Sequence, residues 1–211
     1  MLGLAQRAIK WTLLRFAAHP PGDVRARPQG EADLVARAQN MDPEAWDIIF
    51  NRYYPDIFAY LRYRTASQED AEDLAAMVFE RAVRHIHSYR ETGKGIGAWL
   101  QRIASNLVVD YYRRRSVPGR KTEPLPPKLE DPHISPLEHA LRVDTAEEVR
   151  QVLEHLPASQ RDVLIYRFLL GYNLAETAEI MGKSVNAIKA LQHRALQRLR
   201  EVWQQRTPDE R

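Results

Sequence analysis

The chain has 211 residues, of which 44% are hydrophobic and 28% are charged, and its formal net charge is +3. These values are typical of a soluble globular protein with room for one large or two small domains. The absence of cysteine excludes disulfide bonds, thiol switches and cysteine-ligated zinc. Without cysteine, a reducing compartment is the simplest assumption, and we therefore expect a cytoplasmic protein. No apolar run reaches the roughly 18 residues that a transmembrane helix needs.

Residues 1–30 are interpreted as an N-terminal extension. Basic residues interrupt its apolar run too often for a secretory signal. Its apolar residues share one side of a helical wheel: Leu2, Ala5, Ile9, Leu13 and Phe16. Such an arm can dock on a partner, lie on a membrane surface or remain loosely packed, and the sequence leaves these alternatives open.

The first folded domain is predicted at residues 31–115. A periodic run at 31–39 begins it, and Asp42 followed by Pro43 is typical of the start of a second helix. Pro55 is expected to kink or restart that helix. Aromatic residues along it are predicted to lie in the core: Trp46, Phe50, Tyr53 and Tyr54.

Two further helices complete this domain. Ser67 with Asp70 forms a variant of the capping box ahead of a periodic run that reaches Val83. A glycine-containing loop at 90–95 then leads into a basic helix at about 96–114. Both helices carry enough apolar residues on one side to pack against their neighbours.

The second domain is predicted at residues 136–205, after a linker at 116–135 in which prolines crowd among few large apolar side chains. A short tail at 206–211 follows it. The helices of the second domain are expected near 136–155, 158–170, 174–181 and 185–204. No alternating strand pattern appears, so the predicted fold class is all-α: two small helical domains joined by a Pro-rich flexible linker.

The last two of these helices read as a helix-turn-helix. Gly182 ends the first helix, Ser184 caps the second, and Ala178 is small enough for a close crossing. Ile188, Leu191 and Leu199 are expected to pack inward. No Asp or Glu lies between Ile180 and Arg200, so the outer face is basic and favours double-stranded DNA. An ordinary helical hairpin with a solvated basic face is the alternative.

No catalytic or metal-binding constellation stands out. His85 and His87 are two residues apart, which on a helix places them on different faces. No nucleophile, phosphate-binding Gly-rich loop or ligand cluster accompanies them. We therefore expect no catalytic residue, no metal, no cofactor and no small-molecule substrate, and the histidines are interpreted as surface or cap residues.

Three segments, in their order and spacing, resemble bacterial sigma factors of the extracytoplasmic-function (ECF) group of the sigma-70 family. They are DAEDLAAMVF at 70–79, AWLQRIASNLVVDYYRRR at 98–115, and LPASQRDVLIYRFLLGYNLAETAEIMGKSVNAIKALQHRALQRLR at 156–200. The first two look like region 2 of the family and the third like region 4. The resemblance implies a dissociable, non-enzymatic subunit that binds core RNA polymerase, directs it to promoter DNA and helps to open the duplex.

The resemblance also implies partners. In this family the helix with the Asp-Ala-Glu-Asp-Leu motif docks on the clamp helices of the largest polymerase subunit, the second domain meets the flap of the second largest, and an anti-sigma factor covers these faces. The residues of this sequence that match the family's polymerase contacts are Asp70, Glu72, Asp73, Leu74, Val78 and Phe79. Exposed acids can orient docking on a basic partner. A solvated acidic first turn that favours the helix dipole is the alternative.

Promoter contacts are implied at two places. The loop at 90–95 and the helix after it match the element that captures an unpaired base of the minus-ten sequence. This minus-ten set is Arg90, Glu91, Thr92, Lys94, Trp99, Arg102, Asn106, Arg113 and Arg114, with Tyr89 also available for stacking. For Trp99, a core position is favoured over an exposed one. The minus-thirty-five set of the recognition helix is Lys183, Ser184, Asn186, Ala187, Lys189, His193 and Arg194.

A two-domain helix-turn-helix regulator that is not a polymerase subunit is the rival function. A repressor of this kind would also use a C-terminal helix-turn-helix. It would need neither the basic helix at 98–115 nor the acidic helix before it, and these two helices favour the sigma factor.

Overall fold

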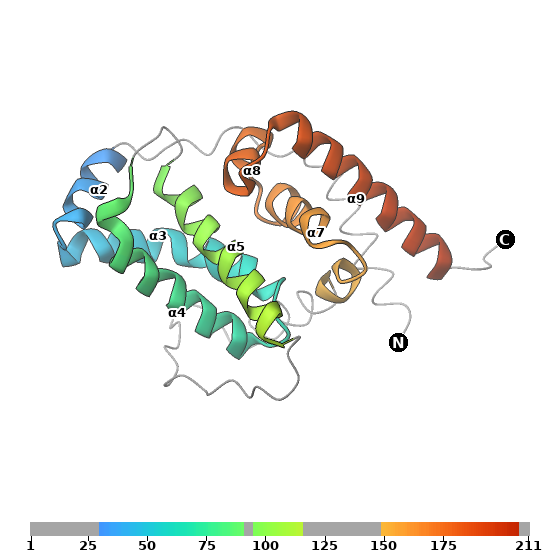
Figure 1. Ribbon diagram of the computed structural model, residues 1–211, viewed down its shortest axis with the longest axis horizontal. Helices are drawn as coiled ribbons and strands as arrows, with labels where there is room; N and C mark the ends of the chain where they lie inside the picture. Colours follow the sequence, from blue (N-terminus) through green and yellow to red (C-terminus); the bar gives the residue numbers. More distant parts are fainter. Residues whose placement is uncertain (1–29, 91–94, 116–148, 207–211) are drawn as a thin grey trace. The chain divides into compact units, whose positions relative to one another are not determined.

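The computed structural model describes residues 30–90, 95–115 and 149–206. They belong to two compact units, the first within residues 30–115 and the second within 149–206. Every regular element in these ranges is a helix, in agreement with the predicted all-α class (Figure 1). Apart from residues 30 and 206, the predicted N-terminal extension, linker and tail lie outside the described residues.

The first unit is built from four helices and one short 3₁₀ turn. They are α2 (Glu31–Gln39), α3 (Pro43–Arg62), α4 (Gln68–His85), the turn η1 (Ile86–Ser88) and α5 (Gly95–Arg115). Helices α3, α4 and α5 pack against one another, and α2 packs on α3 and α5. Figure 1 shows α2 at the same end of this unit as the last turn of α4 and the first turn of α5.

Local capping explains where these helices begin. The Asp42 side chain accepts a hydrogen bond from the Glu44 backbone N–H, which starts α3 with Pro43 in its first turn. Arg37 of α2 donates to the same carboxylate at 2.6 Å. That hydrogen bond holds the pKa of Asp42 below its usual range. The predicted helix starts at 31 and 43 are therefore confirmed, and Arg37 ties the second start to the preceding helix.

Helix α3 passes through Pro55, where the sequence predicted either a kink or a restart. The helix does not restart there but runs on from Pro43 to Arg62. Pro55 deprives the Asn51 carbonyl of its helical partner, and both residues are exposed, so water can satisfy that carbonyl. Ile49 before Pro55 and Ile57 after it are both buried, so packing stabilises both halves of the helix.

The aromatic residues of α3 are less buried than predicted. Trp46, Tyr53 and Tyr54 are half-buried, and Phe50 is exposed. The Phe50 ring lies against Tyr54 and Phe79, with 4.8 Å between ring centroids in each pair. These rings therefore cover the edge of the core, whose centre is formed by aliphatic side chains and Tyr60.

The second unit contains a helical turn at 149–153 followed by a chain of short helices. They are α7 (Ala158–Leu164), the π-helical segment η2 (Ile165–Leu169), α8 (Leu174–Met181) and α9 (Val185–Arg206). The single helix predicted at 158–170 is therefore divided. Arg167 is buried in η2 and donates to the Tyr172 carbonyl and to the Gln192 side chain, which fastens this segment to α9. None of the described helices is long and apolar enough to span a bilayer.

Candidate docking and nucleic-acid surfaces

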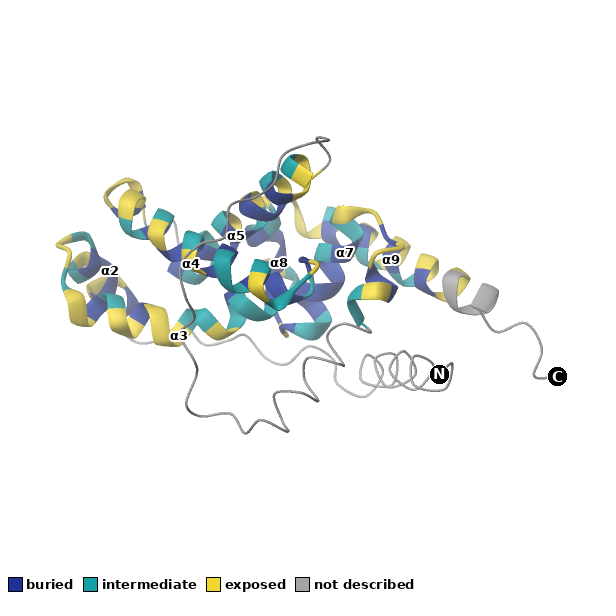
Figure 2. Ribbon diagram, turned by 90° about the horizontal axis from the view of Figure 1, so that it is seen from below, coloured by how far each residue is buried: buried dark blue, intermediate teal, exposed yellow. Residues whose placement is uncertain are grey.

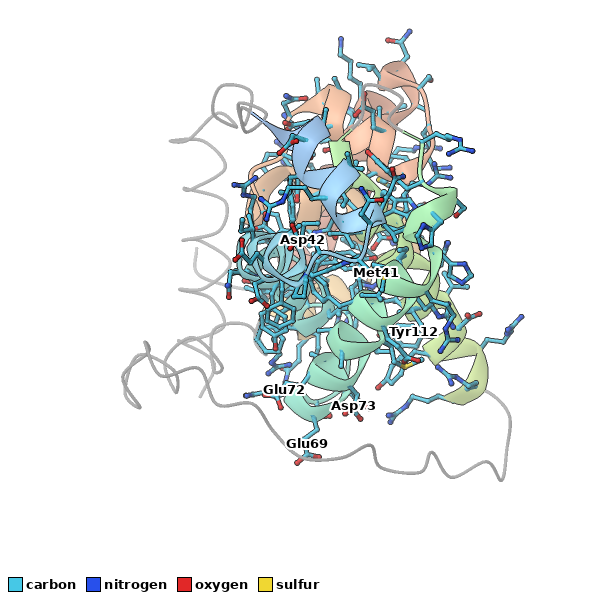
Figure 3. All side chains as sticks on the ribbon, turned by 90° about the vertical axis from the view of Figure 1, so that its left-hand side faces the viewer. Met41, Asp42, Glu69, Glu72, Asp73 and Tyr112 are labelled. Atoms are coloured by element: carbon cyan, nitrogen blue, oxygen red, sulfur yellow. The ribbon has the colours of Figure 1, made fainter. Side chains whose placement is uncertain are left out.

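The first turn of α4 concentrates negative charge. Ser67 caps the helix, because its hydroxyl oxygen accepts from the Asp70 backbone N–H at 3.0 Å. Glu69 is exposed, Glu72 and Asp73 are half-buried, and all three side chains extend away from the ribbon in Figure 3. Partial burial, then the charges of Asp70, Glu72 and Glu69, raise the pKa of Asp73. The acids therefore repel one another, and a cationic partner would relieve that repulsion.

Asp70 has a different environment from the other acids. Its Oδ2 accepts a hydrogen bond from the Tyr111 hydroxyl at 2.8 Å and lies 3.6 Å from an Arg115 guanidinium nitrogen. Partial burial, followed by the hydrogen bond to Asp70, raises the pKa of Tyr111 to about 12. Asp70 therefore joins α4 to the end of α5, and its structural role is evident in the free protein.

The apolar members of the predicted polymerase set are internal. Leu74 is 3% exposed, Val78 is fully buried and Phe79 is 7% exposed, because they lie on the side of α4 that packs against α3 and α5. They cannot contact a rigid partner without opening the unit. That part of the predicted set is thus buried in the free protein, and Glu69, Glu72 and Asp73 are the accessible acids of the candidate docking surface. Glu69 was not in the predicted set.

Helix α5 presents a polar stripe that follows the helical repeat. Arg102, Asn106, Val109 and Arg113 are exposed, and their spacing of four, three and four residues places them on one face. Val109, which is 61% exposed, was not predicted to be part of this surface. An exposed apolar residue among cations and an amide can lie against a sugar or base while its neighbours meet phosphates.

The end of α5 is organised by Asp110. Its carboxylate pairs with Arg113 at 3.1 Å and with Arg81 of α4 at 4.0 Å. Arg114, a predicted DNA contact, is half-buried, and its Nε donates to the Asp110 carbonyl at 3.4 Å. Arg113 is thus the more accessible of the two predicted arginines.

Two aromatic residues flank the predicted minus-ten loop in the sequence and pack on each other. Tyr89 is buried, and Trp99, predicted either to stack on a base or to lie in the core, is half-buried. Their ring centroids are 5.1 Å apart. Arg90 beside them is exposed. The other predicted loop residues, Glu91, Thr92 and Lys94, lie outside the described residues.

The second unit contains the predicted helix-turn-helix. Asn173 and Glu176 form a reciprocal capping box at the start of α8. Gly182 ends α8 with φ of 62°, in the left-handed region that favours glycine. The Lys183 backbone N–H donates to the Ala178 carbonyl, and the Ser184 hydroxyl oxygen accepts from the Ala187 N–H at 3.2 Å. The predicted turn and cap are therefore confirmed.

The two faces of α9 separate as the sequence indicates. Ile188, Leu191 and Leu199 are buried, as predicted, and Ala195 joins them. The exposed residues alternate with these along the helix (Figure 2). The exposed members of the minus-thirty-five set are Lys183, Ser184, Asn186, Lys189, His193 and Arg194, whereas Ala187 is half-buried. The first turn of α9 has no acidic residue, so its N–H groups and cations can meet an anionic backbone.

The described residues contain no group of three or more His, Asp or Glu side chains arranged to hold a metal ion. His85, His87 and His155 are exposed, in agreement with their interpretation as surface residues.

Comparisons with known proteins match both units. Residues 49–117 match the family model for sigma-70 region 2, and residues 152–201 match the model for sigma-70 region 4. The fold is also similar to that of CnrH, solved in complex with the cytosolic domain of CnrY. That similarity has a TM-score of 0.64 and 21% identity, and it covers 85% of this chain and 100% of CnrH. RpoE of Bartonella quintana, solved with the anti-sigma factor NepR, gives a TM-score of 0.54 and 23% identity over 75% of this chain and 96% of RpoE.

Two curated relatives extend the match over most of the sequence. The ECF RNA polymerase sigma factor BldN of Streptomyces coelicolor is 32% identical over 179 residues, which is 82% of this chain and 68% of BldN. The ECF RNA polymerase sigma factor SigD of Mycobacterium tuberculosis is also 32% identical, over 80% of this chain and 81% of SigD. With both sigma-70 regions matched in the expected order, the chain belongs to the ECF RNA polymerase sigma factors.

Proposed function

We propose that this sigma factor divides its work among three surfaces: an acidic one for core RNA polymerase and two polar or basic ones for promoter DNA. The observation that carries the proposal is the separation of charge. Acids gather at the start of α4, a stripe with two exposed arginines follows α5, and α9 begins without an acid. A repressor needs only the last of these surfaces.

Polymerase docking is assigned to Glu69, Glu72 and Asp73. These acids extend from the start of α4. Their mutual repulsion contributes to the raised pKa of Asp73, and a cationic partner surface would relieve that repulsion. The proposed partner surface is the clamp helices of the largest polymerase subunit. Leu74, Val78 and Phe79 act indirectly, because their packing fixes the orientation of α4.

Minus-ten recognition is assigned to the stripe on α5 and to the loop before it. Arg102, Asn106 and Arg113 would bind the backbone of the unpaired non-template strand, and Arg90, Glu91, Thr92 and Lys94 would contact the captured base. Stacking a base on an aromatic side chain contributes about 1–3 kcal/mol, which offsets part of the cost of unstacking it from the duplex. Tyr89 directly precedes that loop in the sequence, and its ring packs on the half-buried Trp99, which follows the loop on α5.

Minus-thirty-five recognition is assigned to the first turns of α9. Lys183, Ser184 and Lys189 would bind phosphates or guanine, and Asn186 is suited to adenine because its amide can both donate and accept. His193 and Arg194 lie two turns further along and extend the contact to the backbone. Ala187, small and half-buried, allows close approach to the base edges.

We propose the following domain boundaries: a region 2 domain at 31–115, a linker at 116–135 and a region 4 domain at 136–205. The second domain would also meet the flap of the second largest polymerase subunit. Membership of the ECF group supports an anti-sigma factor as a third partner, one that competes with polymerase for the acidic surface. Because core polymerase forms the phosphodiester bonds of the RNA, the chain is proposed to be a regulatory subunit without catalysis of its own. We propose that it acts in the cytoplasm.

Run-off transcription tests this proposal. A library of genomic promoters is transcribed by cognate core polymerase with and without the purified protein. New transcripts that start downstream of a shared two-part motif, and only when the protein is added, would support the sigma function. If core gains no initiation while the protein alone binds duplex DNA, the repressor function would replace it.

A further inference from the structure

Helix α2 is hydrogen-bonded to both chain segments that flank residues 91–94. At its C-terminal end, the Gln39 amide nitrogen donates to the Ile86 carbonyl at 3.2 Å and to the Tyr89 carbonyl at 3.1 Å. At its N-terminal end, a Glu31 carboxylate oxygen accepts from the Ile96 backbone N–H at 3.0 Å. One helix of nine residues thus contacts the chain before and after this short segment.

The Glu31 contact acts as a cap supplied from a distant part of the sequence. Helix α5 has no acidic residue in its own first turn, and Glu31 brings a carboxylate to the N-terminal end of the helix, where it accepts from the Ile96 N–H. Glu31 is only 8% exposed, and its carboxylate also accepts from the Tyr53 hydroxyl at 3.0 Å. Burial and the neighbouring Glu31 charge raise the pKa of Tyr53, so its hydroxyl remains a donor.

Two glycines make this approach possible. Gly95 has a φ of 74°, and a Cβ atom there would lie 3.2 Å from the nearer Glu31 carboxylate oxygen. A Cβ atom on Gly97 would lie 2.7 Å from the Tyr53 ring, which is closer than real Cβ contacts. The start of α5 is therefore shaped to receive Glu31 and Tyr53.

The Gln39 contact supports the aromatic pair. The carbonyl that it binds belongs to Tyr89, whose ring packs on Trp99 of α5. A glutamine is suited to this position because its one amide group can donate to the Ile86 and Tyr89 carbonyls together. The Ile86 carbonyl also accepts from the Tyr89 backbone N–H, so Gln39 adds to the bond that closes the turn η1. Gln39 thereby couples α2 to the Tyr89–Trp99 pair.

We propose that Glu31 and Gln39 are positioning residues for minus-ten recognition, and that α2 serves as a strut that fixes the Tyr89 backbone and the start of α5 relative to each other. The inference rests on the proposed minus-ten function of α5 and of the Tyr89–Trp99 pair. The two residues lie at opposite ends of α2, about 12 Å apart along its axis. Fixing Tyr89 and the start of α5 before DNA arrives lowers the ordering cost of binding. The match to the region 2 model begins at residue 49, so the strut lies outside the matched part of that region.

The test uses full-length protein bound to core polymerase and a fluorescent single-stranded oligonucleotide that carries the minus-ten sequence of a promoter from the run-off assay. Glu31→Ala removes the cap, and Gln39→Glu keeps the side-chain shape but places a carboxylate against two carbonyls. Glu31→Gln is the conservative variant, because its amide oxygen can still accept from Ile96. Ala36→Gln, on the exposed side of α2, is the matched control.

We expect Glu31→Ala and Gln39→Glu each to weaken oligonucleotide binding about tenfold. They should also reduce discrimination between the promoter and versions with a substituted minus-ten base. Binding to core polymerase and to a minus-thirty-five duplex should stay within about twofold of wild type, a separation that general unfolding would not give. Glu31→Gln should restore most of the oligonucleotide affinity.

Wild-type affinity and discrimination in both variants would overturn the inference alone, as would equal losses for the oligonucleotide and the minus-thirty-five duplex. If wild-type holoenzyme itself fails to bind the oligonucleotide, the proposed minus-ten function fails and the inference fails with it. Thermal unfolding of each variant sets a common temperature at which all of them are folded.

Discussion

The starts of α4 and α9 share a local geometry and differ in charge. Each is capped by a serine whose oxygen accepts from the N–H three residues later, Ser67 from Asp70 and Ser184 from Ala187. The turn that follows Ser67 carries acids, whereas the turn that follows Ser184 carries none. The same cap therefore presents an anionic surface in one unit and, in the other, an acid-free helix start flanked by Lys183 and Lys189. We propose that the charge at each helix start, more than its backbone shape, selects the macromolecule that it binds.

The largest effect is expected from reversing the charge at the first of these starts. Asp73→Lys places a cation against the proposed basic clamp surface, and like-charge contacts at an interface cost several kcal/mol, so core polymerase binding should weaken by about 100-fold or more. Binding to an isolated minus-thirty-five duplex should not change. Titration of labelled core polymerase measures the first quantity, and Glu80→Lys, at an exposed position later in α4, is the matched control.

Removing a charge at the start of α9 should have a somewhat smaller effect on DNA binding than the reversal at α4 has on polymerase binding. Lys189→Ala is expected to weaken binding to the minus-thirty-five duplex by about 1–3 kcal/mol if Lys189 meets guanine. If it binds phosphate instead, the slope of log affinity against log salt should fall by about 0.9. Arg200→Ala removes the same charge about 22 Å from the start of α9 and should have much less effect. Equal losses for both variants would mean that only net charge matters.

The shared cap predicts a stability effect of similar size in both units. Ser67→Ala and Ser184→Ala should each lower the free energy of unfolding of their own unit by about 1 kcal/mol. Ser67→Ala should cost more, because the Ser67 hydroxyl also donates to the Asp70 carboxylate at 2.9 Å. Hydrogen exchange measured at increasing denaturant concentrations assigns each loss of unfolding free energy to one of the two units. A larger loss for Ser184→Ala would contradict this ranking.

The smallest expected effect concerns repulsion among the acids of α4. Folding raises the pKa of Asp73, so the folded state binds a proton more readily than the unfolded state does. Stability should therefore decrease as the pH rises through the interval between the unfolded and folded pKa values. Asp73→Asn should raise stability at neutral pH by up to about 0.5 kcal/mol, as for other like-charge neighbours one turn apart. It should have no effect well below the unfolded pKa.

Local sequence signals predicted the helix starts and the turn well. Asp42, Ser67 and Ser184 cap helices as expected, and Gly182 adopts the left-handed conformation that its position before Ser184 predicts. These features depend on residues within three or four positions of one another, so one sequence contains the information.

What the sequence could not predict depends on contacts between distant residues. Leu74, Val78 and Phe79 matched a docking motif, but packing against α3 and α5 buries them. The sequence placed Asp70 at an interface and gave no sign of its bond to Tyr111, which lies 41 residues later. The Glu31–Ile96 bond spans 65 residues, and only the acid-free first turn of α5 indicates that an external cap is needed.

Photo-crosslinking within a reconstituted promoter complex tests the central comparison most directly. A crosslinkable residue is placed at position 73 of α4 or at position 189 of α9, and the complex contains core polymerase and promoter DNA. We predict that position 73 crosslinks to the largest polymerase subunit and that position 189 crosslinks to DNA at the minus-thirty-five element. Crosslinking of both positions to DNA, with none to polymerase, would contradict the assignment of the two helix starts to different partners.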